Sequence, residues 1–211
     1  MTAFITHCLK NARLDLIGLL VGACLFWGHS GSVQADAPLT EISVLRLERD
    51  GESVVLTANV KFELSTAVQE ALYKGVPMVF VAEIDIFRER WYWTNKKVVN
   101  AERHMRLAYQ PLTRRWRLNV ASGVITQAGL AVALNQNFDT LTDALAAVQR
   151  LSRWKIADVA DLDLEQKHQV EFRFRLDVSQ LPRPFQIGTL GQTDWSISVS
   201  SNQPLLLDNV K

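Results

Sequence analysis

A strict alternation of apolar and polar side chains between Gln169 and Val178 is the feature that most limits how this chain can fold. The apolar members are Val170, Phe172, Phe174, Leu176 and Val178. Between them stand Glu171, Arg173, Arg175 and Asp177. A period of two places alternate side chains on opposite faces of a strand. The segment therefore predicts a β-strand with one face toward a core and one polar face.

Similar patterns recur along the chain, separated by turn signals such as Asp50-Gly51. Strands are predicted over 41–48, 53–62, 78–90, 97–110, 116–120, 169–178 and 195–199. Two short helices are predicted, one from a Ser65 cap to Gly75 and one from a Thr140 cap to Leu151. Residues 121–137 are weakly periodic and predict a short strand or a loop. The order of elements favours a mainly β (α+β) fold with antiparallel, sandwich-like sheets and two short helices.

The strands over 78–90 and 97–110 predict a hairpin whose register can be read from charge. With Thr94-Asn95 as a two-residue turn, three polar-face pairs follow: Glu83 with Arg106, Asp85 with His104, and Phe87 with Glu102. The other face then pairs Phe80 with Tyr109, Ala82 with Leu107, and Ile84 with Met105. A slip of one residue would mix the two sets, so the agreement favours this hairpin.

Residues 1–35 have the pattern of a secretory signal peptide. Lys10 and Arg13 precede an apolar stretch from Leu14 to Trp27, which is short for a membrane-spanning helix, and Val33-Gln34-Ala35 forms a small-residue cleavage site. We expect cleavage after Ala35 and a single exported, periplasmic globular domain over residues 36–211. Two alternatives are an uncleaved anchor and a lipoprotein, the latter because Val21-Gly22-Ala23-Cys24 loosely resembles a lipobox.

Removal of this segment would leave a chain with no cysteine and two histidines, His104 and His168. Such a chain can form no disulfide and has no thiol nucleophile. It also lacks a phosphate-binding glycine loop, a G-x-S-x-G elbow and an H-E-x-x-H helix. We therefore expect no cofactor and no metal site. His168, at the start of a strand, is expected on the surface.

Glu83 and Asp85, joined by His104 in the predicted register, form the sharpest catalytic candidate. Carboxylates two residues apart on a strand are separated by about 6.6 Å along the axis, at the lower edge of the spacing in inverting glycosidases. The alternative is a ladder of solvated cross-strand charge pairs, which is the more common role of such residues. The catalytic hypothesis would make the protein an envelope glycan hydrolase.

The clustering of basic residues in one segment is a stronger indication of function than the catalytic candidate. The segment 88–117 holds nine basic and two acidic residues, while the predicted mature chain is neutral. Aromatic side chains are interleaved with the basic ones, and such a surface suits an anionic partner. The candidate binding residues are Arg88, Arg90, Trp91, Tyr92, Trp93, Arg114, Arg115 and Arg117. The alternative is that the arginines pair with acidic residues elsewhere, while Trp116 and either Trp91 or Trp93 join the core.

Several further motifs carry a resemblance to a known family. They are Phe62-Glu63-Leu64, Ala71-Leu72-Tyr73-Lys74-Gly75-Val76-Pro77, Phe80 to Trp93, Leu107-Ala108-Tyr109, Phe138-Asp139-Thr140-Leu141 with Ala144-Leu145, Leu181-Pro182-Arg183-Pro184-Phe185, and Asp194-Trp195. With these motifs the chain resembles the domain of unknown function 4390 family of secreted proteobacterial proteins, over nearly all of the predicted mature chain. The resemblance implies an exported single domain and transfers no catalytic residue.

From the residues we expect a non-enzymatic binding or adaptor protein of the cell envelope. Its partner would be an anionic envelope component or an envelope protein, met through the basic, aromatic hairpin. Nucleic acid is not expected, because export would keep the protein away from it, and no stable membrane span is expected after cleavage. Two alternatives stay open: the hydrolase using Glu83, Asp85 and His104, and a purely structural partner, for instance the sensor side of a membrane signalling protein.

Overall fold

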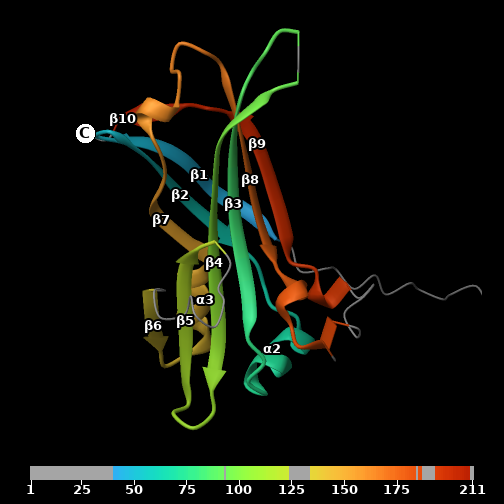
Figure 1. The fold of residues 1–211 in the computed structure, drawn as a ribbon. Coiled ribbons are helices and arrows are strands. Elements are labelled where there is room, and N and C mark those ends of the chain that lie inside the picture. The colour runs from blue at the N-terminus through green and yellow to red at the C-terminus, as the bar shows by residue number, and fades with distance from the viewer. Residues whose placement is uncertain (1–39, 93, 124–133, 184, 187–192, 210–211) are drawn as a thin grey trace, which may run out of the picture. The chain divides into compact units, whose positions relative to one another are not determined.

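A computed structural model describes residues 40–209, apart from residues 93, 124–133, 184 and 187–192 (Figure 1). The predicted signal peptide and its cleavage site after Ala35 lie outside the described residues. Trp93 and much of the weakly periodic segment 121–137 do so too. Residues Ala37–Lys211 form one compact unit.

Ten strands in the described part of the chain form two sheets. The four-stranded sheet has the order β10-β1-β2-β7, and the six-stranded sheet has the order β6-β5-β4-β3-β8-β9. The strands are β1 (Glu41–Asp50), β2 (Ser53–Lys61), β3 (Met78–Arg88), β4 (Lys96–Gln110), β5 (Arg115–Ser122), β6 (Leu134–Phe138), β7 (Arg150–Asp158), β8 (His168–Leu176), β9 (Ser198–Pro204) and β10 (Leu207–Asn209). Neighbours are antiparallel except β1 and β10. The expected mainly β, antiparallel fold is confirmed.

Two α-helices, α2 (Thr66–Tyr73) and α3 (Leu141–Gln149), begin at the predicted caps. The Ser65 hydroxyl accepts a hydrogen bond from the Val68 amide, and the Thr140 hydroxyl accepts one from the Asp143 amide. Such caps satisfy amides that have no partner within the helix. Short 3-10 turns cover Val159–Asp161 (η2), Val178–Gln180 (η3) and Thr193–Trp195 (η4).

One hydrophobic core combines side chains from both sheets and both helices. Phe62, just after β2, lies 5.3 Å from Phe80 of β3 and 5.4 Å from Phe174 of β8, measured between ring centroids. The even-numbered residues of β3 and β8 supply much of this core, as the alternation predicts. Each fully buried side chain of this size contributes about 1.5–3 kcal/mol to stability.

The hairpin of β3 and β4 forms, but the predicted register is wrong. Asp85 lies opposite Asn100, and Glu83 lies opposite Glu102. His104 lies opposite Val81. The cause is the turn, since β3 ends at Arg88 and β4 begins at Lys96, so the connection is longer than Thr94-Asn95. From Met78 to Ile86 the displacement is four residues, an even number, so these side chains and their partners keep their predicted faces.

The apolar face shifts with it. Phe80 lies opposite Met105 and not Tyr109, Ala82 opposite Arg103 and not Leu107, and Ile84 opposite Ala101 and not Met105. On the polar face Phe87 lies opposite Lys97 and not Glu102. A register irregularity between Ile86 and Phe87 adds to the difference, and such bulges cannot be read from alternation.

Three elements of the second half differ from the prediction. Helix α3 ends at Gln149, and Leu151 belongs to β7, a strand the alternation did not reveal. Irregularities in the pairing of β2 with β7 break the period of two there, which explains the omission. The last long strand begins at Ser198, while Trp195 is buried within η4. His168 is buried and not exposed as predicted.

Candidate functional site

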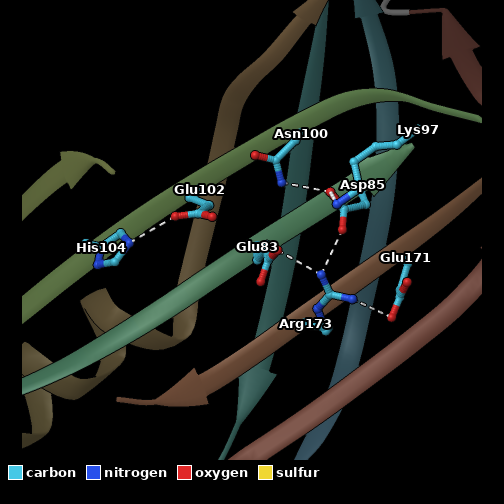
Figure 2. Close-up of polar contacts among 8 residues, drawn as sticks. All are labelled: Glu83, Asp85, Lys97, Asn100, Glu102, His104, Glu171 and Arg173. Carbon is cyan, nitrogen blue, oxygen red and sulfur yellow. Dashed lines mark hydrogen bonds and ion pairs between the residues drawn. The ribbon is translucent and has the colours of Figure 1, made fainter. Parts of the chain in front are cut away.

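The face of the six-stranded sheet opposite the core, here called the polar face, carries a network of charged side chains (Figure 2). Asp85, on β3, is only 1% exposed. Its Oδ1 atom lies 2.8 Å from Nζ of Lys97 and accepts a hydrogen bond of 2.7 Å from Asn100. Its Oδ2 atom accepts a hydrogen bond of 2.7 Å from Nη2 of Arg173. The carboxylate is thus held by two cations and an amide.

Arg173, on β8, joins three carboxylates in this network. Its Nη2 atom also donates to Glu83 over 2.8 Å, and its Nη1 atom donates to Glu171 over 2.6 Å. β8 lies beside β3, with Arg173 opposite Glu83 and Glu171 opposite Asp85. The guanidinium therefore lies between acidic groups of two strands, and these hydrogen bonds raise the pKa of Arg173.

Opposing effects set the protonation of Asp85. Burial favours the neutral acid, but hydrogen bonds from Lys97 and Asn100, with the charge of Lys97 and the contact to Arg173, outweigh it. The pKa of Asp85 therefore lies below its ordinary value. A general acid at neutral pH needs the opposite shift. The carboxylate is instead an ionised member of a cross-strand ion-pair network.

His104 does not join Asp85, because the register places it beside Val81. Its Nε2 atom lies 3.3 Å from Oε2 of Glu102 (Figure 2), and its Nδ1 atom is buried with no hydrogen-bond partner in the part of the chain that the structure describes. The three residues of the hydrolase hypothesis thus lie on one face but do not form one group. Within the described residues there is no cluster of three or more metal-ligating side chains.

The second candidate region lies at the turn between β3 and β4. We define the hairpin-tip surface as Arg88, Arg90, Trp91, Tyr92 and Lys167. Together with Glu89 and Gln166 these residues line a hollow of about 930 Å³. The indole of Trp91 is 92% exposed, and its ring meets Tyr92 edge to face at 4.6 Å. Three cations and two largely exposed rings therefore surround one open hollow.

Lys167 reaches this surface because the segment before β8 is tied to the end of β3. The Glu89 amide donates to the Lys167 carbonyl over 2.9 Å, and the Gln169 side chain donates to the Glu89 carboxylate over 2.7 Å. Arg88 lies 4.0 Å from Asp163 of the same segment. Arg90 and Lys167 are exposed. Lys167 was missed by sequence reasoning, since it is far from Arg90 in the chain and no motif singles it out.

The remaining candidate arginines lie elsewhere. Arg114, Arg115 and Arg117 are at the turn between β4 and β5, at the opposite end of β4 from the hairpin tip (Figure 1). β4 has 15 residues, so its ends are roughly 45 Å apart. Arg115 pairs with Asp139. The structure thus brings together Arg88, Arg90, Trp91 and Tyr92, and separates them from the three later arginines.

The aromatic residues of the segment divide in the same way. Trp116 is buried beside Tyr73 and Tyr109, as the alternative interpretation of the segment expected, whereas Trp91 is not part of the core. Trp93 is outside the described residues. Among the described residues, the aromatic side chains that line the hollow at the hairpin tip are therefore Trp91 and Tyr92.

Fold and site together describe a β-rich domain with an internally paired polar face and a cationic, aromatic hairpin tip. Residues 37–203 match the family model described as Domain of unknown function (DUF4390), and the chain belongs to that family. Comparison with curated proteins and with solved structures gave no match. No helix in the described ranges is long and apolar enough to cross a membrane.

Proposed function

We propose that this protein is a non-enzymatic binding protein of the cell envelope, exported by residues 1–35, that recognises an anionic envelope component through the hairpin-tip surface. The observation that carries the proposal is the hollow of about 930 Å³ lined by Arg88, Arg90 and Lys167 together with the rings of Trp91 and Tyr92. One carboxylate, Glu89, also lines it, and that carboxylate already accepts a hydrogen bond from Gln169. The hollow therefore keeps an excess of positive charge.

Phosphate groups of envelope lipids are the anions that this surface suits best. Arginine offers paired donors to phosphate oxygens, and each cation near an anionic lipid surface contributes about 1 kcal/mol. Exposed tryptophan and tyrosine favour the boundary between headgroups and hydrocarbon. The polar face does not favour the alternative hydrolase function. Asp85 is held in ion pairs with Lys97 and Arg173, and Glu83 is held in an ion pair with Arg173.

Binding to lipid vesicles tests the proposal. The protein should bind phosphatidylglycerol vesicles and leave phosphatidylcholine vesicles unbound at low salt, and binding should weaken steeply toward about 0.5 M salt. In the double variant Arg90→Gln/Lys167→Gln, loss of two cations should weaken binding roughly thirtyfold. Equal binding to both kinds of vesicle, or binding indifferent to salt, would refute the proposal.

Export has its own test. The amino terminus of protein recovered from a periplasmic fraction should begin at Asp36, since cleavage is expected after Ala35. A full-length chain confined to the cytosol would overturn the exported part of the proposal while leaving the vesicle measurement to judge the binding surface.

A further inference from the structure

An apolar groove adjoins the hairpin-tip surface. We define the leucine groove as the hollow of about 640 Å³ lined by Leu164, His168, Leu205, Leu206 and Leu207, together with Glu89, Gln166, Lys167, Gln169 and Pro204. It lies where the chain passes from β9 in the six-stranded sheet to β10 in the four-stranded sheet. Its volume is within the range of small-molecule sites.

The wall of this groove exposes leucine side chains to solvent. Leu206 is 75% exposed and Leu164 is 49% exposed, while Leu205 and Leu207 are half-buried against the core. Covering such side chains releases water and favours binding in proportion to the apolar area removed from solvent. The groove therefore suits the hydrocarbon part of a ligand.

His168 lies in the wall of the groove as a buried polar residue. The side chain is 5% exposed, and its Nδ1 atom lies 2.9 Å from the Gln166 carbonyl, which can only accept, so Nδ1 is the donor. The Nε2 atom is buried with no partner among the described residues.

Three residues connect the leucine groove to the hairpin-tip surface: Glu89, Gln166 and Lys167 line both hollows. A single ligand that fills the two must be anionic at one end and apolar at the other. We propose that the protein binds one monomeric anionic amphiphile, with its phosphate at the hairpin-tip surface and its acyl chain in the leucine groove. This inference rests on the proposed function and names its ligand class. The leucine segment lies beyond residue 203, where the family match ends.

The length of the ligand's acyl chain distinguishes binding in the leucine groove from binding of the headgroup alone. Lysophosphatidylglycerols with chains of six, eight and ten carbons, kept below their critical micelle concentrations, are titrated against the full chain and followed by calorimetry. Each methylene that enters the groove should strengthen binding by up to about fourfold. Glycerophosphoglycerol, which has the same headgroup and no chain, gives the contribution of charge alone.

Two matched variants test whether the acyl chain of the ligand binds in the leucine groove. Leu206→Asp should remove most of the dependence on chain length, whereas Leu112→Asp should keep it, because Leu112 is 101% exposed at the distant turn between β4 and β5. Both leucines are exposed, so neither variant should unfold the domain. Salt-sensitive binding that ignores chain length would overturn the amphiphile and leave the proposed function standing. Absence of binding to any lysolipid and to anionic vesicles would overturn both.

Discussion

Arg88 and Arg115 lie at opposite ends of β4, because Arg88 pairs with Lys96, its first residue, and Arg115 pairs with Gln110, its last. A basic segment that is continuous in sequence is therefore two surfaces in space. The surface at Arg88 is hollowed beside the exposed rings of Trp91 and Tyr92 and is supplemented by Lys167. This geometry makes one end of the hairpin the better candidate for binding.

The ion-pair network around Asp85 should stabilise the fold. In Asp85→Asn the buried carboxylate is lost, and Lys97 and Arg173 lose a shared partner. Both cations are partly exposed and can be hydrated, so the expected loss is about 1–2 kcal/mol, less than for a fully buried pair. Urea unfolding measures it. Glu171→Gln, which removes one half-buried contact to Arg173, should cost less than about 0.5 kcal/mol. Equal effects of the two substitutions would contradict this account.

Acid should weaken the fold through Asp85 and Asp177. Burial favours the neutral form of Asp177, but hydrogen bonds from Ser179 and Gln180 and the charge of Arg175 outweigh it, so its pKa is lowered too. A carboxyl whose folded pKa is lowered stabilises the fold fully above the ordinary value of 3.8. That stabilisation disappears as pH falls through the lower, folded-state pKa.

Unfolding free energies measured across this acidic range should therefore decline as pH falls below about 4. The decline should be shallower in Asp177→Asn, which cannot titrate at that position. A variant whose stability falls with pH as steeply as that of the native protein would show that Asp177 is not responsible.

The aromatic core should be sensitive to truncation. Phe174 is fully buried and its ring packs against those of both Phe62 and Phe80. Phe174→Ala removes that packing and leaves a cavity, so we expect a loss of about 3–5 kcal/mol in urea unfolding. Leu112→Ala, at a fully exposed position, should change stability by less than about 0.5 kcal/mol. A small effect at Phe174 would mean that the two sheets do not share this core.

The cap of α3 provides a smaller, local prediction. Thr140→Ala removes the hydroxyl that accepts from the Asp143 amide over 3.1 Å, which should cost about 0.5–2 kcal/mol. Thr140→Ser keeps the hydroxyl and should retain most of the stability. If both variants lose the same amount by thermal or urea unfolding, the methyl group and not the cap is responsible.

Local patterns in the sequence were sufficient to predict the two faces of β8 and the helix caps. Alternation in Gln169–Val178 identifies a strand, since burial on one face selects apolar side chains at every second position. Ser65 and Thr140 mark their helices because caps are formed within four residues. These features depend on neighbours in the chain, so the sequence reveals them.

Features that depend on turn length and distant contacts were not predictable. The agreement of charges favoured Asp85 beside His104, yet the longer connection after Arg88 places Asn100 there. A shift of the register by an even number of residues keeps apolar side chains opposite apolar ones and polar side chains opposite polar ones. Alternation alone therefore cannot distinguish registers that differ by four residues. Lys167 joins the hairpin-tip surface through a backbone hydrogen bond to Glu89, a contact that leaves no local signal.

The most direct test compares the two ends of β4 at equal net charge. Arg90→Gln/Lys167→Gln and Arg114→Gln/Arg117→Gln each remove two exposed positive charges, so a purely non-specific attraction would be weakened equally in both. We predict that the first variant loses roughly thirtyfold in affinity for phosphatidylglycerol vesicles, while the second changes by less than about twofold. Equal losses, or a greater loss at Arg114 and Arg117, would contradict the assignment of binding to the hairpin tip.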